Sequence, residues 1–447
     1  MEEKTTMKPV EIIRTETIKP SSPTPSHLKT FKLSILDQLA PPVYVPMLFF
    51  YPNKDVIITA EQKSQQLKKS LSESLARFYP IAGRINNNTT IECSDEGAPY
   101  VEARYSGLLS NFLEQSADDI TVVQGFLPAA MESFREASTW PLLLVQATFF
   151  DCGGLAIGVS MSHKFADATT IGIFMKSWAA ASRGFGDEKV LVPALNGTSC
   201  FPQIDISGFQ PPMVVLKKGE SVTKRYVFDK PKIEAMKAKI ADRSNHTSSQ
   251  CDNGRAHQPT RVEVVTAIIW KCLMAASRSN SGVPKFVVSR SMNIRTRAEP
   301  PLPENLVGNF VATIASHTNE HEPEIQDLVA ELRNGIREFT ETRAKRLLGE
   351  DTLQVIFHGL KEVKEFMERD DTDGLFFTSM CNFQLYEKVD FGWGKPIWVT
   401  IPFATDHGNV VTLIDTRDGG VEAWVTMSKQ NMALFDCEPQ ILQFTNP

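Results

Sequence analysis

The chain has 447 residues, of which 42% are hydrophobic and 22% are charged, and its formal net charge is −6. This composition is typical of a globular protein with a substantial core and excludes a disordered or fibrous chain. Because a domain takes roughly 100–200 residues, the length predicts two or three domains, of which we favour two. No dense basic stripe is present, so we expect no nucleic-acid partner.

The lack of an evident targeting signal and the cysteine usage predict a cytoplasmic protein. The opening segment MEEKTTMKPV is polar, so we expect neither a secretory signal nor a transit peptide. The longest apolar stretches fall short of the roughly 20 residues that a membrane helix needs, so we expect no membrane partner. The 7 cysteines contain no C-x-x-C pair, which argues against a zinc site and against a disulfide framework.

The first half of the chain predicts a helix, two strands and a second helix. Residues 59–78 place their leucines on one stripe behind Thr59, an N-cap residue, which predicts an amphipathic helix. The apolar runs 142–150 and 155–161 are joined by a short segment with two glycines, and they predict buried antiparallel strands. Apolar side chains at helical spacing over residues 168–182 predict the second helix.

A segment without periodicity separates the two halves of the chain. Over residues 191–219 four prolines accumulate, as in an extended crossover between domains. We therefore predict an N-terminal domain over residues 1–190, a crossover linker over 191–219 and a C-terminal domain over 220–447.

The second half alternates strands and helices, which makes the predicted class mixed α/β. A capping box at Thr260-Arg-Val-Glu263 marks the start of one helix. In chain order we predict a strand over 224–228, a helix from Asp229, a mobile surface loop over 243–259, a helix over 260–276, a strand over 285–291, helices over 325–345 and 353–367, and short strands around Val399, Val411 and Glu422.

The motif His163-Lys-Phe-Ala-Asp167 lies where a predicted strand ends and a predicted helix begins. A side chain at such a position can project into a cleft from a rigid frame. An imidazole can be neutral at physiological pH and can accept a proton from a hydroxyl, so His163 is a candidate general base. The alternatives are a chance pairing of His and Asp, and an Asp167 that only caps the helix.

Two further clusters of residues are candidates for a structural turn or for an ion pair. Asp390-Phe-Gly-Trp-Gly394 combines two glycines with aromatic residues and a carboxylate, which predicts a structural turn with close backbone approach. Arg295 and Arg297 follow a predicted strand, where one of them could pair with a buried carboxylate. The alternative is that both arginines are solvated.

Other patterns are discounted. His317 and His321 could form a metal pair, but their flanking residues favour a loop and no third ligand is evident, so we predict no metal. The pair Lys217-Lys218 is most simply a solvated face. No G-x-S-x-G elbow and no G-x-G-x-x-G loop follows a strand, which argues against the common hydrolases and dinucleotide-binding enzymes.

The motifs H-x-x-x-D and D-F-G-W-G, in this order and at this separation, resemble those of the BAHD acyltransferases of plant specialised metabolism. The resemblance covers essentially the whole chain, and within the family it is strongest to members that acetylate alkaloids or terpenoids. It is also carried by the stretches Leu36-Asp-Gln38, Tyr79-Pro-Ile-Ala-Gly-Arg84, Asp151-Cys-Gly-Gly154, Asn305-Leu-Val-Gly-Asn309 and Gly420-Val-Glu-Ala-Trp424.

This resemblance implies two chloramphenicol-acetyltransferase-like domains, each a mixed sheet flanked by helices, joined by the crossover with a solvent channel between them. It implies that an acyl-CoA donor and a small-molecule alcohol acceptor meet at His163 in one ternary complex, without a covalent acyl-enzyme. We therefore expect a cytoplasmic, monomeric O-acyltransferase. Acetyl-CoA or another acyl-CoA would be its co-substrate, and no cofactor would be bound permanently.

The resemblance also implies roles for single residues. His163 would take the proton of the acceptor hydroxyl, while Asp167 would point away from the channel and pair with Arg295. Thr378 would help to stabilise the oxyanion, although Met380 occupies a position where some relatives have Trp, and a thioether cannot donate a hydrogen bond. An architectural role is implied for Asp390, Gly392, Trp393 and Gly394.

Two alternatives to an acyltransferase remain open. An esterase could use the same histidine to activate water, but the absence of a nucleophilic serine motif argues against it. A non-catalytic ligand-binding homologue is the second alternative, and the intact His163 argues against that.

Overall fold

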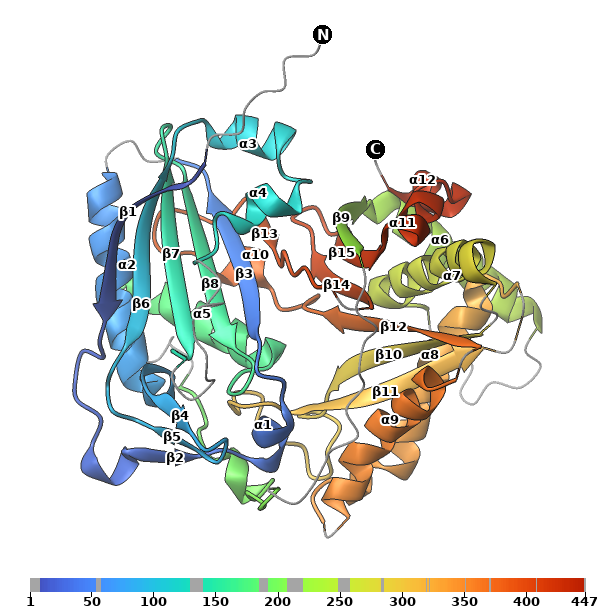
Figure 1. Ribbon diagram of the computed structural model, residues 1–447, viewed down its shortest axis with the longest axis horizontal. Helices are drawn as coiled ribbons and strands as arrows, with labels where there is room; N and C mark the ends of the chain where they lie inside the picture. The colour runs from blue at the N-terminus through green and yellow to red at the C-terminus, as the bar shows by residue number, and fades with distance from the viewer. Residues whose placement is uncertain are drawn as a thin grey trace. The chain divides into compact units, whose positions relative to one another are not determined.

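The computed structural model describes two compact units of the chain (Figure 1). Unit 1 comprises Met1–Gly208, Leu302–Phe310 and Phe383–Phe403, and unit 2 comprises Phe209–Pro301, Val311–Asn382 and Ala404–Pro447. Within them the structure describes residues 9–53, 58–128, 140–184, 192–206, 220–247, 258–282, 285–318, 320, 322–349, 351–369, 371–406 and 408–445.

The two units are interleaved along the chain. Unit 1 includes Leu302–Phe310 and Phe383–Phe403, two segments that come from the second half of the sequence. Of the predicted crossover, only residues 192–206 are among the described residues, and Lys217-Lys218 lie outside them. The domain limits 1–190, 191–219 and 220–447 therefore stay predictions.

Unit 1 is built on a six-stranded mixed sheet with the strand order β1-β6-β7-β8-β3-β13. Only β6 and β7 pair in parallel, and the other neighbours are antiparallel. The antiparallel pair predicted from the two apolar runs is confirmed as β7 and β8. The strands are β1 (Glu11–Ile18), β3 (Tyr44–Tyr51), β6 (Ala98–Tyr105), β7 (Leu143–Phe150), β8 (Leu155–Ser162) and β13 (Trp398–Thr400).

Aromatic packing explains why β13 joins this sheet. Trp398 of β13 is the register partner of Phe50 in β3, and the two rings stack with centroids 4.9 Å apart. Phe50 also packs against Phe112 and Phe126, and all three phenylalanines are buried. Burial of such large rings stabilises the sheet by roughly 1.5–3 kcal/mol for each side chain. A short segment late in the sequence thereby completes a sheet that is built from the first half of the chain.

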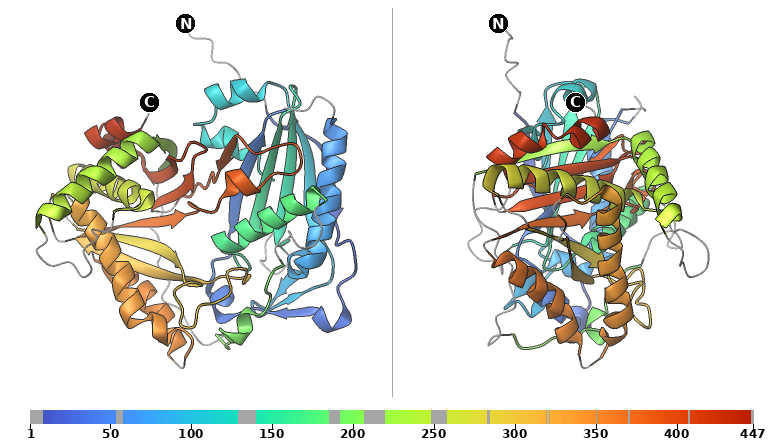
Figure 2. Two further views of the ribbon diagram at one scale, coloured as in Figure 1. Left: turned by 180° about the vertical axis from the view of Figure 1, so that it is seen from behind. Right: turned by 90° about the vertical axis from the view of Figure 1, so that its right-hand side faces the viewer.

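Two long helices of unit 1 confirm the helical predictions. In α2 (Ala60–Arg77), a capping box between Thr59 and Gln62 starts the helix. The second helix, α5 (Ala168–Ser182), begins immediately after the H-x-x-x-D motif. The helices α2 and α5 pack against each other (Figure 2). The Trp178 indole of α5 donates a hydrogen bond to the backbone oxygen of Leu67 in α2.

The remaining elements of unit 1 are short. A small sheet has the strand order β2-β5-β4, and α1 follows β2 directly in the sequence. These elements are β2 (Thr30–Lys32), β4 (Arg84–Asn86), β5 (Thr90–Glu92), α1 (Ile35–Leu39), α3 (Leu109–Gln115), α4 (Ile120–Gln124) and α10 (Leu385–Lys388).

Unit 2 is built on a second six-stranded mixed sheet, with the strand order β11-β10-β12-β14-β15-β9. Its strands are β9 (Ser221–Phe228), β10 (Lys285–Asn293), β11 (Val311–Thr318), β12 (Thr372–Ser379), β14 (Asn409–Asp415) and β15 (Val421–Ser428). Its helices are α6 (Lys230–Thr247), α7 (Arg261–Ser281), α8 (Ile325–Thr342), α9 (Thr352–Met367), α11 (Lys429–Phe435) and α12 (Pro439–Phe444).

Most predictions for unit 2 are confirmed, and two are corrected. The capping box at Thr260 is present, and α7 continues past the predicted end. The loop predicted over 243–259 is wrong at its start, because α6 continues to Thr247; residues 248–257 lie outside the described part of the chain. His317 lies in β11 and not in a loop, since it is the register partner of Val287 in β10.

Candidate active site

His163 directly follows β8 and lies in the turn that leads into α5. Its backbone N–H donates to the Val43 oxygen at 2.9 Å, beside the start of β3. The backbone N–H groups of Phe165 and Ala166 both donate to the Ser162 oxygen and close the turn. The imidazole is half-buried, so a fixed backbone presents a partly accessible ring.

Asp167 closes the motif as the N-cap of α5, as the structural interpretation of this residue predicts. One carboxylate oxygen accepts from the Thr170 N–H at 2.8 Å, and the other accepts from the Phe310 N–H at 3.0 Å. The residue is only 1% exposed. The carboxylate therefore ties the start of α5 to the segment Leu302–Phe310, which belongs to the same unit.

That segment also brings Asn309 to His163. Nδ1 of His163 lies 3.0 Å from Oδ1 of Asn309, and Nδ2 of Asn309 donates to the His163 backbone oxygen at 2.7 Å. The same Nδ2 donates to Oδ1 of Asp37 at 3.0 Å, and the Asn309 N–H donates to this oxygen at 2.7 Å. Three side chains from distant parts of the sequence thus form one hydrogen-bonded chain.

Asp37 is held in place by α1. Its Oδ2 accepts from the backbone N–H of Ser34 at 3.0 Å and from the Ser34 hydroxyl at 2.6 Å. The Asp37 N–H in turn donates to the Ser34 hydroxyl oxygen at 3.2 Å, which completes a capping box. The carboxyl is 3% exposed, and burial raises its pKa from 3.8 to about 6, although hydrogen bonds from Ser34 and Asn309 act in the opposite direction. The site therefore contains a buried carboxylate that the predicted site residues do not include.

Lys164 connects the motif to the other end of α1. Its ammonium donates to the backbone oxygens of Gln38 and Ala40, each at 2.8 Å. Burial lowers the pKa of this lysine to about 8, while the charge of Asp37 raises it. The short helix α1 is thereby anchored to the His163 turn through Lys164 and, by way of Asn309, through Asp37.

Sequence reasoning missed the roles of Asp37, Asn309 and Lys164. Asp37 lies in the stretch Leu36-Asp-Gln38 and Asn309 ends the stretch Asn305-Leu-Val-Gly-Asn309, both of which carry the family resemblance. Those stretches were a signal, but neither spacing nor periodicity assigns a partner to either residue.

The Asp390 motif folds as a self-capped turn in unit 1. Its Oδ1 accepts from the N–H groups of Gly392 at 2.8 Å and Gly394 at 3.0 Å. Both glycines have positive φ, +112° and +106°, which L side chains rarely adopt. The Trp393 ring stacks on Phe391 with centroids 5.7 Å apart. All hydrogen bonds described for the Asp390 carboxylate lie within its own turn.

The turn is also fastened to the two long helices. The Phe391 oxygen accepts from the Gln66 amide of α2 and from the Ser182 hydroxyl of α5, each at 2.8 Å. Arg183, just beyond α5, donates to the Asp390 backbone oxygen. These hydrogen bonds attach the motif to α2 and to the end of α5, which is consistent with a structural role.

Two predicted site residues, Arg295 and Thr378, belong to unit 2, as does Met380. Arg295 is 1% exposed and donates to the Asn293 side chain, so the alternative of a solvated arginine is wrong for this residue. Thr378 lies half-buried in β12, and Met380 is buried just beyond it. The pairing of Arg295 with Asp167, and the role of Thr378 toward the oxyanion, stay predictions.

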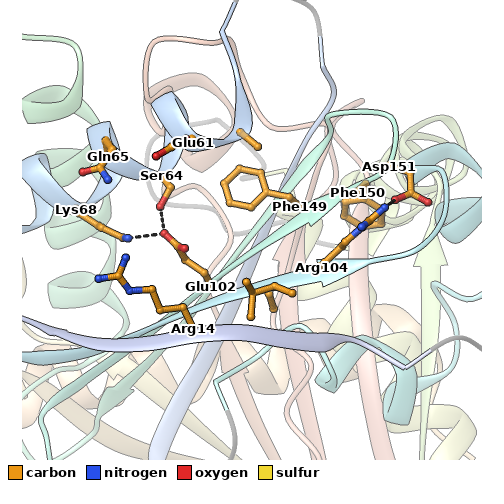
Figure 3. A pocket seen from close by; sticks show the side chains of 13 residues that line it. Arg14, Glu61, Ser64, Gln65, Lys68, Glu102, Arg104, Phe149, Phe150 and Asp151 are labelled. Carbon is orange, nitrogen blue, oxygen red and sulfur yellow. Dashed lines mark hydrogen bonds and ion pairs between the residues drawn. The ribbon is translucent and has the colours of Figure 1, made fainter.

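A pocket of about 590 Å³ lies elsewhere in unit 1, beside α2, β6 and β7. Figure 3 shows the side chains of Lys68 and Ser64 directed at Glu102, with which both interact. Arg104 pairs with Asp151 at 2.9 Å at the other end of the pocket. None of the predicted site residues lines this pocket, and these charges are paired within it. The candidate site is therefore assigned around His163.

The described residues contain neither a candidate membrane-spanning helix nor a candidate metal site. No helix in the described ranges combines the length and apolar composition that crossing a membrane requires. In the same ranges, no group of three or more His, Cys, Asp or Glu side chains is placed to hold a metal ion. His321, half of the discounted metal pair, lies outside them.

Comparison with known sequences gives matches along the whole chain. A family model described as the Transferase family matches residues 8–442. The chain is 36% identical over 453 residues to epi-neemfruitin B synthase L1AT of Melia azedarach, with 98% of each chain covered. It is 35% identical over 438 residues to stemmadenine O-acetyltransferase of Catharanthus roseus, with 96% of each covered. With limonoid 7-O-acetyltransferase of Citrus sinensis the identity is 34% over 460 residues, with 97% of each covered.

Comparison with solved structures agrees. The crystal structure of vinorine synthase, a Rauvolfia serpentina protein, matches with a TM-score of 0.82 at 34% identity, covering 98% of both chains. F. sporotrichioides TRI101, complexed with coenzyme A and T-2, matches with a TM-score of 0.71 at 16% identity, covering 93% of this chain and 99% of that one, which shows likeness of fold alone. With a family match over nearly its whole length and relatives of this identity, the chain belongs to the BAHD acyltransferases of the Transferase family.

Proposed function

We propose that this acyltransferase transfers an acetyl group from acetyl-CoA to a hydroxyl of a plant alkaloid or terpenoid, with His163 as the general base. The names of the relatives as O-acetyltransferases support an O-acetyl product, and the coenzyme A complex of a protein with the same fold supports a CoA donor. The observation that carries the proposal is the His163 imidazole, which is half-buried on a fixed turn with Nδ1 engaged by Asn309.

The reaction needs one proton relay and no covalent acyl-enzyme. The neutral imidazole takes the proton of the acceptor hydroxyl through Nε2 as the oxygen attacks the thioester carbonyl. The tetrahedral oxyanion then collapses and breaks the carbon–sulfur bond. The imidazolium returns its proton to the leaving CoA thiolate, so the products are an acetyl ester and free CoA thiol. Holding both substrates together supplies much of the rate.

Other residues support this chemistry in the proposal. The Thr378 hydroxyl can donate a hydrogen bond to the oxyanion, whereas the Met380 thioether cannot. Asp167 keeps the His163 turn in place through its N-cap and its bond to Phe310, and we propose Arg295 as its ionic partner.

We also propose that the protein is a cytoplasmic monomer. The cysteine usage supports the compartment, since the six cysteines within the described residues are all free thiols, as a reducing compartment predicts. Size-exclusion chromatography with light scattering tests the oligomeric state, and a stable dimer would contradict this part of the proposal.

The decisive experiment follows the acyl group. The purified protein is incubated with acetyl-CoA labelled in the acetyl group and a panel of alkaloid and triterpenoid alcohols, and the products are identified by mass spectrometry. We expect the label in an ester of at least one alcohol. Label released only as free acetate would support an esterase, and an unchanged donor with every alcohol would support a non-catalytic homologue.

A further inference from the structure

We infer that Asp37 is a positioning residue for His163: acting through the Asn309 amide, its carboxylate determines which imidazole nitrogen carries the proton. This inference rests on the proposed function, because it explains how the base is kept in its reactive form. Asp37 does not touch a substrate in this scheme, and it acts only through Asn309.

The first step concerns the orientation of the Asn309 amide. Its Nδ2 lies between two oxygens, Oδ1 of Asp37 at 3.0 Å and the His163 backbone oxygen at 2.7 Å. A flipped amide would place its own oxygen against both acceptors, one of them a carboxylate, and would lose both hydrogen bonds. The carboxylate therefore favours the orientation in which Oδ1 of Asn309 faces the imidazole.

The second step concerns the proton on His163. Nδ1 of the ring lies 3.0 Å from Oδ1 of Asn309, and an amide oxygen can only accept a hydrogen bond. Nδ1 must therefore carry the hydrogen, which leaves the lone pair on Nε2. Nε2 is the nitrogen that the proposed mechanism uses as the base. With the opposite tautomer, Nε2 would carry a hydrogen and could not accept the hydroxyl proton.

The third step concerns the rigidity of Asp37 itself. Four N–H or O–H groups, from Ser34 and Asn309, donate to its two oxygens, and the carboxyl is buried. With a pKa of about 6, the group is largely ionised at neutral pH and acts only as an acceptor. The nearby Lys164 ammonium, whose own hydrogen bonds go to Gln38 and Ala40, holds the end of α1.

The chain His163–Asn309–Asp37 resembles the His–Asp part of a Ser-His-Asp triad, with an amide inserted between the imidazole and the carboxylate. In such triads, the carboxylate sets the tautomer and the orientation of the histidine, and its amide replacement lowers turnover strongly. Here the effect passes through a neutral amide. We therefore expect a smaller loss, about 10-fold to 100-fold in kcat.

The test uses the variants Asp37→Ala and Asp37→Asn in the full-length protein, with Asp95→Asn as the matched control. Asp95 lies in the same unit, and its carboxylate accepts from Thr24 and Lys29 instead of the His163 network. The first readout is ¹⁵N NMR of histidine-labelled protein without substrates, at a pH where the imidazole is neutral. The His163 signals are assigned by their loss in His163→Ala.

In the wild type we expect Nδ1 to show the shift of a protonated nitrogen and Nε2 that of an unprotonated one. In Asp37→Ala we expect the two shifts to move toward each other, with Asp37→Asn in between. The second readout is steady-state kinetics, where kcat should fall about 10-fold to 100-fold while KM for acetyl-CoA changes less than about twofold. Asp95→Asn should leave both readouts unchanged.

Three results would overturn the inference. One is a wild-type His163 with its proton on Nε2, and another is a pair of Asp37 variants that keep both the wild-type tautomer and the wild-type kcat. The third is an equal loss of kcat in Asp95→Asn. If Asp37→Ala does not fold, Asp37→Asn decides alone. The tautomer is measured without substrates, so this test of the inference does not depend on the proposed function. The proposed function itself is tested by His163→Ala and by product analysis.

Discussion

At the scale of single residues, the histidine and the aspartate of the H-x-x-x-D motif have different surroundings. His163 is half-buried, and the described hydrogen bonds of its ring involve Nδ1. Asp167 is buried, and each of its oxygens accepts from a backbone N–H. A partly accessible ring suits proton transfer, whereas a carboxylate enclosed by backbone donors suits the fixing of a turn.

We therefore predict that Asp167→Asn lowers stability at least as much as it lowers turnover. The amide would turn an NH₂ group toward either the Thr170 N–H or the Phe310 N–H, which leaves a buried donor unsatisfied. Such a group costs about 1–3 kcal/mol. Urea denaturation and kcat per folded molecule would be measured together. A variant as stable as the wild type but inactive would contradict the structural role.

The raised pKa of Asp37 predicts that the free energy of unfolding depends on pH. Burial raises the pKa of its carboxyl from 3.8 to about 6, so between these values the folded protein binds a proton that the unfolded chain has released. The stability from this site is full below the lower value and is lost as the pH rises through the upper one.

We expect this slope to be absent in Asp37→Asn. From about pH 4 to about pH 7, the free energy of unfolding of the wild type should fall relative to that of the variant by about 1–3 kcal/mol. Urea denaturation of both proteins across this range measures the difference. Parallel pH profiles would mean that Asp37 has the same pKa in the folded and unfolded chain.

From the sequence, the chemical role of a single residue is easier to predict than the residues with which it forms hydrogen bonds. His163 and Asp167 follow from one short motif between a strand and a helix. Asn309 lies 146 positions from His163 and 272 positions from Asp37, so no spacing rule connects the three. Their contact depends on how Leu302–Phe310 packs in unit 1, which is a property of the tertiary fold.

At the scale of elements, prediction succeeds where a strand is a continuous apolar run or a helix has apolar residues at helical spacing, and where a turn or cap marks the boundary. The strands β7 and β8 and the helices α2, α5 and α7 are of this kind. By contrast, β1 is mostly exposed and carries charges at the edge of its sheet, so it has no clear apolar run. The strand β11 was missed because small and polar residues fill much of it.

The Asp390 turn is an element that we predict to stabilise and not to catalyse. Asp390→Ala removes the acceptor of the Gly392 and Gly394 N–H groups. We expect a loss of about 1–3 kcal/mol in stability, with kcat per folded molecule changed less than about threefold. Thermal unfolding and active-enzyme titration measure the two effects. A collapse of kcat without any loss of stability would instead place Asp390 in the chemistry.

At the scale of the whole molecule, the main feature that the sequence does not reveal is the interleaving of the two units. Linker composition suggests a boundary between contiguous halves, but composition does not report where a segment packs. Leu302–Phe310 and Phe383–Phe403 belong to unit 1, where they supply Asn309, the Asp390 turn and the strand β13. The candidate site is thus assembled from segments that lie far apart along the chain.

The central claim is that His163 acts as the base in transfer of an acyl group from CoA to an alcohol. It is tested most directly by the turnover of His163→Ala with labelled acetyl-CoA and an accepted alcohol, normalised to folded protein. We predict a kcat lower than that of the wild type by about 10²–10⁴-fold, with an unchanged unfolding transition. A folded His163→Ala variant that forms the labelled ester at nearly the wild-type rate would contradict it.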